Sequence, residues 1–182
     1  MTGLPVRPPG RPHPRDLLGL LEAHVGTAAA ARLCAEVLAS DDPHEHADTV
    51  LFLGGPAGRS VLEDGTSWKP YWTRVWGARG LLYVWDDVAA PVVLDRLDDE
   101  HWRVAEMCLN VAALRELPCG DHAVRLAGHE LPRVRVAAAR ALGACGDTEH
   151  RAALDELVVD PSEDVRRAAG RALERMEERL DG

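Results

Sequence analysis

A short alanine-rich motif recurs four times along the chain at nearly constant intervals. The copies are marked by Arg74, Ala105, Arg135 and Arg166, and the intervals between these residues are 31, 30 and 31. A fixed period of this length is typical of repeat proteins, in which each unit contacts mainly its neighbours. The sequence therefore predicts a repeat architecture.

The apolar residues of each copy follow the three-and-four spacing of one helix face. In the second copy, a literal match of Arg103 to the other arginines would bury Glu106 and Asn110, so periodicity sets the alignment there. The predicted buried positions are Val104, Cys108, Val111 and Ala112 in the second copy, Val134, Ala138, Ala141, Leu142 and Cys145 in the third, and Val165, Ala169, Ala172, Leu173 and Met176 in the fourth.

Shorter amphipathic segments lie between the copies and are expected to be helices over 88–97, 121–131 and 148–158. Polar residues, proline or glycine separate each segment from its partner, and Ser162 is the predicted N-cap of the last helix. Helix pairs joined by tight turns at this period form an α-solenoid. The predicted fold class is therefore all-α, a solenoid of paired antiparallel helices.

The stretches Pro132–Asp147 and Asp160–Leu173 resemble the short HEAT-like repeat that is also seen in phycobilisome lyases. The resemblance is clearest over residues 130–176, extends over 72–129 and is weak over 16–71. It implies a curved, right-handed stack of helix pairs that is usually used for binding proteins. The family has no common catalytic residue to carry over to this chain.

The resemblance and the periodicity together predict two parts of the chain. Residues 1–15 are rich in proline and arginine and are expected to form an extended, flexible tail. Residues 16–182 are expected to form a single HEAT-like solenoid domain, with divergent capping helices and a loop over 16–71 and repeats over 72–182.

Within the divergent part, helices are expected over 16–24 and 28–38, and a third from 42 to about 53. A glycine-containing loop is expected over 54–70. Loops of this length are uncommon in compact domains unless they cover or bind something.

Composition narrows the functional classes. The net charge of −9 argues against a nonspecific nucleic-acid partner, because phosphates demand a basic face. No run approaches the ~18 apolar residues of a membrane span, and the start of the chain lacks the apolar core of a secretory signal. The 4 cysteines are scattered without close pairing and are expected to be reduced core residues. These features predict a cytoplasmic protein, and arginine in place of lysine suggests a bacterial, high-GC origin.

No motif in the chain specifies a reaction. The glycines near Arg59 depart from a phosphate-binding loop in their spacing and in the basic residue. His44 and His46 lie two residues apart on a predicted helix and so point in different directions. The His-Glu pairs of deoxyhypusine hydroxylase, a HEAT-like di-iron enzyme, have no counterpart at the matching repeat positions. We predict a non-enzymatic protein with no catalytic residues, no metal and no cofactor.

The candidate binding surface lies on the outward face of the repeat helices. At about 100° per residue, Arg79, Asn110, Arg140 and Arg171 form one column, with Trp72 at its upper end. The resemblance implies that this column faces the concave groove. We expect it to bind a protein partner through an acidic or extended segment, by forked hydrogen bonds and stacking.

Two features leave alternatives open. All 5 tryptophans lie between residues 68 and 102, where they fill either a narrow core or a binding hot spot. The flanking Arg74, Arg135 and Arg166 are expected either to bind a partner or to pair with acids of adjacent repeats, such as Asp99, Asp147 and Asp164.

Two other functions are compatible with this scaffold. HEAT-like alkylation-repair glycosylases use tryptophans and an aspartate in a concave cleft. Similar residues in this chain are Trp85, Asp86 and Asp87 with Trp72, Trp76 and Trp102. The net charge of −9 and the small number of repeats weigh against that activity. Chaperoning of a chromophore, as in the lyases, rests on the repeat resemblance alone. Because fold likeness does not decide function, an adaptor or scaffold is the main hypothesis.

Overall fold

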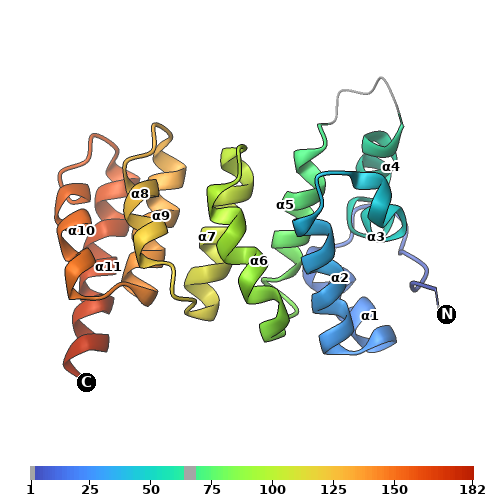
Figure 1. The fold of residues 1–182 in the computed structure, drawn as a ribbon, viewed down its shortest axis with the longest axis horizontal. Helices are drawn as coiled ribbons and strands as arrows, with labels where there is room; N and C mark the ends of the chain where they lie inside the picture. The colour runs from blue at the N-terminus through green and yellow to red at the C-terminus, as the bar shows by residue number, and fades with distance from the viewer. Residues whose placement is uncertain (1–2, 64–68) are drawn as a thin grey trace. The chain divides into compact units, whose positions relative to one another are not determined.

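The computed structural model describes residues 3–63 and 69–182, and Trp68 lies outside this range. The described residues form eleven α-helices and no strand, so the predicted all-α solenoid class is confirmed. The chain divides into two compact units, Met1–Arg96 (unit 1) and Leu97–Gly182 (unit 2), which are described separately (Figure 1). None of the described helices combines the length and the hydrophobicity needed to cross a membrane.

The described part of unit 1 contains six α-helices, one more than the sequence predicted. The predicted loop over 54–70 is wrong in part, because Pro56–Leu62 is helical. Gly55 has a φ of 57°, which ends one helix, and Pro56 starts the next at a position where proline is well tolerated. The helices are α1 (Pro14–Val25), α2 (Thr27–Ala39), α3 (Ala47–Gly54), α4 (Pro56–Leu62), α5 (Tyr71–Gly80) and α6 (Ala90–Asp95).

The described part of the N-terminal segment contains no helix before Pro14 and lies against unit 1. Arg7 Nε donates a hydrogen bond to the Phe52 carbonyl at 2.8 Å, and its guanidinium group covers Gly55. The side chain of Arg7 therefore attaches this segment to the α3–α4 turn. The flexibility of residues 1–15 stays a prediction.

Helix α5 lies deep inside unit 1 because it packs against α1, α2, α3 and α4. A Cβ atom on Gly77 would lie 2.6 Å from the Cys34 carbonyl oxygen, so the α2 and α5 backbones touch directly. This enclosure explains why Val75, one turn before the predicted outward residue Arg79, is buried. Little of α5 is therefore open to a partner.

Unit 2 consists of the later repeats and follows the predicted periodicity closely. Of the predicted buried positions, Cys145 and Leu173 are half-buried and the rest are buried. Ser162 is the N-cap residue of the last helix, although its side chain makes no capping hydrogen bond. The helices are α7 (Trp102–Arg115), α8 (Gly120–Ala127), α9 (Pro132–Cys145), α10 (Arg151–Leu157) and α11 (Glu163–Asp181).

Helices α9 and α11 form the most extensive helix contact of the unit. Their backbones approach closely at Gly143, where an added Cβ atom would lie 2.7 Å from the Cα atom of Ala172. Small residues allow this approach, because even one methyl group at position 143 would have to displace the facing helix.

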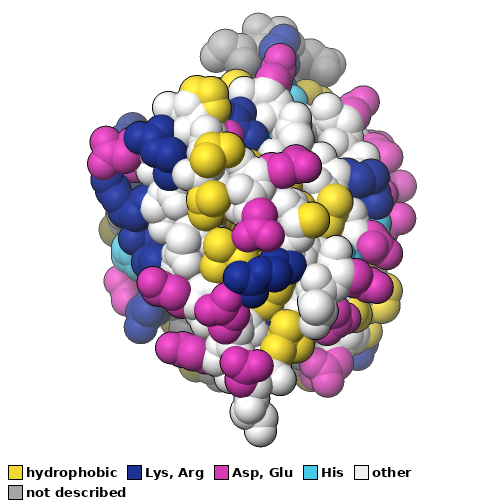
Figure 2. Space-filling model, turned by 90° about the vertical axis from the view of Figure 1, so that its left-hand side faces the viewer, with side chains coloured by type: hydrophobic (Ala, Val, Ile, Leu, Met, Phe, Trp, Pro, Cys, Tyr) yellow, Lys and Arg dark blue, Asp and Glu magenta, His cyan; other side chains and the backbone are white. Residues whose placement is uncertain are grey.

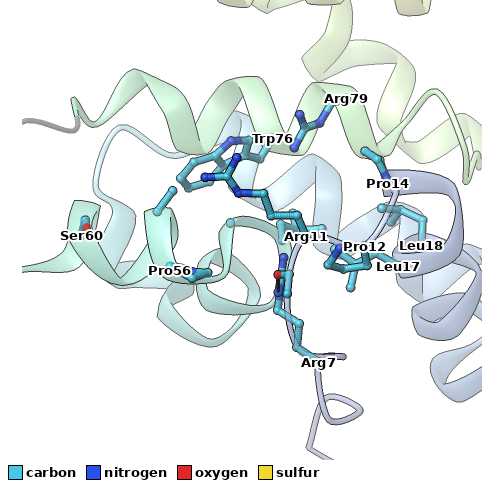
Figure 3. A pocket seen from close by; sticks show the side chains of 15 residues that line it. Arg7, Arg11, Pro12, Pro14, Leu17, Leu18, Pro56, Ser60, Trp76 and Arg79 are labelled. Atoms are coloured by element: carbon cyan, nitrogen blue, oxygen red, sulfur yellow. Dashed lines mark hydrogen bonds between the residues drawn. The ribbon is translucent and has the colours of Figure 1, made fainter.

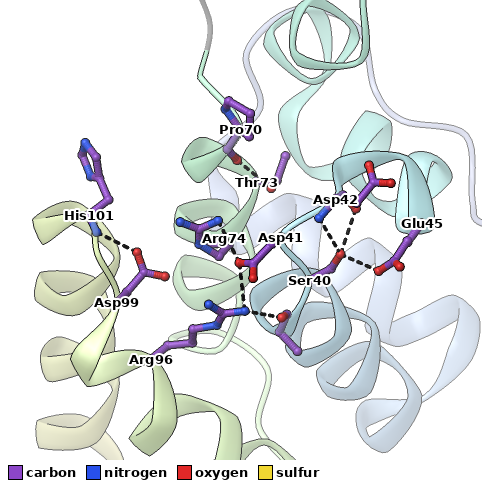
Figure 4. A network of polar contacts seen from close by, with 11 residues as sticks. Ser40, Asp41, Asp42, Glu45, Pro70, Thr73, Arg74, Arg96, Asp99 and His101 are labelled. Atoms are coloured by element: carbon purple, nitrogen blue, oxygen red, sulfur yellow. Dashed lines mark hydrogen bonds and ion pairs between the residues drawn. The ribbon is translucent and has the colours of Figure 1, made fainter.

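Two of the flanking arginines, Arg74 and Arg135, pair with acids in the turns between helices. In unit 2, Arg135 pairs with Asp160, and Arg166 donates to the Asp160 carbonyl oxygen at 2.7 Å. In unit 1, Asp41 accepts from Arg74 and lies 3.1 Å from Arg96 (Figure 4). Asp41 and Asp160 both lie in turns between helices, and the helical period does not predict the positions of turn residues.

Candidate functional site

A groove of about 690 Å³ crosses α7, α9 and α11 in unit 2. It brings together three of the predicted site residues, Asn110, Arg140 and Arg171. Each of the three helices contributes one of them, at the outward position that the helical period predicted. The other lining residues are Glu106, Leu131, Pro132, Arg133, Val136, Ala137, Asp164 and Arg167.

Two of the four arginines in the groove are neutralised by neighbouring carboxylates. Arg133 Nε lies 2.9 Å from a Glu106 carboxylate oxygen, and the Glu106 side chain is only 12% exposed. Arg167 pairs with Glu163 at 2.5 Å and with Asp164 at 3.5 Å, both on its own helix. These pairs add little net charge to the groove.

Arg140 and Arg171 differ from the other two arginines of the groove. Both are exposed, and no carboxylate among the described residues lies within ion-pair distance of either. Asn110 donates from Nδ2 to the Glu106 carbonyl oxygen at 2.9 Å, which holds its side chain at the wall. The groove therefore offers two uncompensated guanidinium groups beside a fixed amide.

The charge of this groove is opposite to that of much of the surrounding surface. Figure 2 shows acidic side chains spread over the face that carries α10 and α11, with basic side chains gathered along one edge. A local positive site on a chain with a net charge of −9 attracts an acidic ligand and orients it.

A cluster formed by the Trp102 ring and the side chains of Arg103 and Arg133 adjoins the groove. It was not part of the predicted binding column. The Arg103 and Arg133 guanidinium groups lie 4.2 and 4.9 Å from the centre of the Trp102 ring system. Arg133 thus joins the ring to the groove through a cation–π contact. The sequence signal for this contact is the spacing of Trp102 and Arg133. They are 31 residues apart, which is one repeat period, so they occupy equivalent positions in adjacent repeats.

The predicted residue Arg79 lines a separate cavity of about 560 Å³ in unit 1. Arg7 and Arg11 line the same cavity, together with the buried ring of Trp76, and no lining residue is acidic. Figure 3 shows Arg11 extending from the N-terminal segment toward Trp76. Burial lowers the pKa of Arg79, although interaction with Tyr83 partly opposes this effect.

Trp72, the fifth predicted site residue, lines neither of these cavities. It is half-buried at the start of α5, and its ring lies 5.4 Å from that of Tyr71. The structure thus brings three predicted residues together in unit 2 and places Arg79 and Trp72 in different surroundings within unit 1.

The acidic residues after Trp85 have local structural roles. Asp86 accepts a hydrogen bond from the Val88 backbone N–H at 3.1 Å, and Asp87 accepts one from Trp85 Nε1 at 3.1 Å. These bonds start the short helical turn before α6. The hydrogen bonds of Asp86 and Asp87 are therefore not evidence for a glycosylase site.

One group of possible metal ligands occurs among the described residues. Ligand atoms of Asp147, Glu149 and His150 lie within 4.8 Å of one another, although the two carboxylates are exposed. His150 Nδ1 already accepts the Asp147 backbone N–H at 2.8 Å, and Nε2 lies 3.3 Å from Asp121. The imidazole is therefore used to begin the turn before α10, and the expected absence of a metal stays a prediction.

Two of the cysteines that are scattered in the sequence lie close together in the fold. The Sγ atoms of Cys119 and Cys145 lie 2.9 Å apart. The two residues are 26 positions apart in the chain, so only the packing of α8 against α9 brings them together.

Comparison with known proteins supports the repeat assignment. Residues 120–180 match the family model for HEAT repeats, and no curated protein matches the chain. The fold is similar to the CpcE–CpcF complex of phycocyanin lyase from Nostoc sp. PCC7120, at 18% identity and a TM-score of 0.58, covering 98% of this chain and 70% of that chain. A designed armadillo repeat protein in complex with the peptide (KR)4 has 18% identity and a TM-score of 0.47, covering 89% and 81%.

Proposed function

We propose that this HEAT-like repeat protein is a non-enzymatic scaffold that binds an acidic, extended segment of a partner protein in the groove of unit 2. The observation that carries the proposal is the pair of exposed arginines, Arg140 and Arg171, which share one groove and lack carboxylate partners among the described residues. Guanidinium groups recognise carboxylates by forked hydrogen bonds.

The shape of the groove supports an extended ligand. Three helices contribute to it in register, so its polar groups recur from one repeat to the next along the groove. A chain segment with carboxylates at intervals would meet Arg140 and Arg171 in turn. The apolar atoms of Val136 and Ala137, which also line the groove, would contact its backbone or aliphatic side chains.

The test measures binding of a short labelled glutamate-rich peptide to the full chain by fluorescence anisotropy. Reversal of both arginines to glutamate (R140E/R171E) should raise the Kd at least tenfold, which is a loss of about 1.4 kcal/mol of binding free energy. It should also reduce the dependence of the Kd on salt concentration. A lysine-rich peptide of the same length should not bind the parent protein.

The matched control reverses Arg32 and Arg59, which are exposed in unit 1, and changes the net charge by the same amount. This control should bind the glutamate-rich peptide as the parent does. Equal weakening in both variants would show that only the net charge matters, and absence of binding to the parent would refute the groove as an acidic-peptide site.

The unit 1 cavity favours a second candidate function, the handling of a small acidic ligand with an apolar body. The similar phycocyanin lyase complex is compatible with this proposal, and its support within the chain is the set of three arginines around Trp76. Anilinonaphthalene sulfonate, a fluorescent aromatic anion, is a suitable probe. Replacement of Arg79 by alanine should weaken its binding, and Arg32→Ala should not; equal binding by both variants would refute this proposal.

A further inference from the structure

The pair Cys119 and Cys145 lies outside the groove and has a chemistry of its own. Cys119 is the N-cap residue of α8, and Cys145 is the last residue of α9. Their sulfurs are 2.9 Å apart, and the Cys145 thiol donates to the Ala141 carbonyl oxygen at 3.0 Å. This leaves the Cys119 thiol to donate its hydrogen to the sulfur of Cys145.

The surroundings favour the thiolate form of one cysteine over the other. The hydrogen bond from Cys119 lowers the pKa of Cys145 to about 7, burial opposes this, and the positive charges of Arg179 and His150 assist it. The same hydrogen bond and burial raise the pKa of Cys119. Because the thiolate is the nucleophile, Cys145 reacts first and Cys119 follows.

Access to solvent agrees with this order. Cys145 is half-buried and Cys119 is buried, so Cys145 is the more accessible of the two to a small oxidant. Cys34 is buried, and burial raises its pKa to about 12, which makes it unreactive at neutral pH. Cys34, Cys119 and Cys145 therefore differ sharply in their expected reactivity.

We propose that Cys119 and Cys145 are a redox modification site, at which a peroxide converts the two thiols into a reversible disulfide between the start of α8 and the end of α9. The disulfide requires a sulfur–sulfur distance of about 2.05 Å, so the sulfurs must approach by about 0.9 Å from their 2.9 Å separation.

The reaction has two steps. The Cys145 thiolate attacks one oxygen of hydrogen peroxide, the O–O bond breaks, and the departing hydroxide takes up a proton to become water. Cys145 is then a sulfenic acid. The sulfur of Cys119 attacks the sulfur of Cys145, the S–O bond breaks, and hydroxide leaves with the Cys119 proton as water. Overall, two thiols and one hydrogen peroxide give one disulfide and two waters.

The experiment treats the reduced full chain with stoichiometric hydrogen peroxide, alkylates the remaining thiols and maps the peptides by mass spectrometry. The expected product has lost two hydrogen atoms, has Cys119 linked to Cys145, and keeps Cys34 and Cys108 alkylated. Dithiothreitol should restore all 4 thiols. The oxidation rate should rise with pH through about 7, as the Cys145 thiolate forms.

Variants separate the two roles. Cys119→Ser should accumulate sulfenic acid at Cys145, which dimedone traps, whereas Cys145→Ser should leave Cys119 reduced. Cys108→Ala removes a buried cysteine elsewhere in unit 2 and should form the Cys119–Cys145 link as the parent does.

The peptide map of the unmodified chain decides the proposal even if a variant fails to fold. Four alkylatable thiols after peroxide treatment would overturn it. A Cys145 sulfinic acid without a cross-link would also overturn it, as would a disulfide that joins other cysteines.

Discussion

The Arg135 guanidinium group holds the Asp160 carboxylate by two hydrogen bonds, from Nε at 2.7 Å and from Nη2 at 2.9 Å. Asp160 also accepts the Ser162 backbone N–H at 2.8 Å, and its side chain is only 7% exposed. One carboxylate thus connects the first turn of α9 to the turn that begins α11. The pair is a structural connection between successive repeats.

Replacement of Asp160 by asparagine should destabilise unit 2 by about 3 kcal/mol, because the Arg135 charge loses its partner in a poorly solvated position. Chemical denaturation monitored by circular dichroism measures this change. Asp155→Asn is the matched control, since Asp155 is exposed and its only described ion pair is a 3.9 Å contact with Arg151. Equal effects of the two substitutions would contradict the proposed importance of the Arg135–Asp160 pair.

The same pair predicts a pH dependence. The hydrogen bond from Arg135 is the main cause that lowers the pKa of Asp160 in the folded protein. Its stabilisation is therefore complete above the unfolded pKa of about 3.9 and is lost as the pH falls through the lower, folded value. The difference in unfolding free energy between the parent and Asp160→Asn should be constant from neutral pH to about pH 5 and shrink below about pH 4. A difference that grows on acidification would contradict this assignment.

Leu142 is a second test of the repeat packing. Its side chain is fully buried on the predicted inward face of α9, so Leu142→Ala should cost about 2–5 kcal/mol. Repeats depend on their neighbours, and α11 should therefore lose hydrogen-exchange protection together with α9. Leu114→Ala, at a leucine on α7 that is 54% exposed, should change the melting temperature little.

Two glycines of unit 2 should respond in opposite directions to the same substitution. Gly143→Ala places a methyl group 2.7 Å from the Ala172 Cα atom and should destabilise the unit by about 1–3 kcal/mol. Gly170→Ala adds a methyl group with nothing within 4 Å and should stabilise α11 by about 0.5–1 kcal/mol, because alanine favours helix. Thermal melts of the two variants measure both effects, and shifts of the same sign would contradict the close contact.

The helices of unit 2 could be predicted from the sequence because each buries one face with the 3.6-residue period. Val134, Ala138 and Leu142 illustrate this, since they lie on one face and are all buried. The 3.6-residue period predicts burial less well where other helices enclose a helix on several sides. Val75 and Arg79 lie on α5, which contacts four other helices. The first is buried and the second half-buried.

From the sequence, only the site residues that share one outward helix face could be predicted. That face correctly placed Arg140 and Arg171 beside each other, because both occupy equivalent positions in adjacent repeats. Which arginines lack a counter-ion depends on turns and on neighbouring helices, as Asp160 shows. The Cys119–Cys145 contact has no sequence signal, because the two residues are at opposite ends of different helices.

Gly143 also sets the distance between two groove residues, although Gly143 itself does not line the groove. Arg140 lies nearly one turn before it on α9, and Arg171 directly precedes Ala172, the residue against which Gly143 packs. The separation of the two arginines is therefore set by backbone contact behind the groove. A related chain with a larger residue at this position would hold the same arginines farther apart and so select ligands with a different distance between carboxylates. Partner choice could then change during evolution while every side chain in the groove stayed the same.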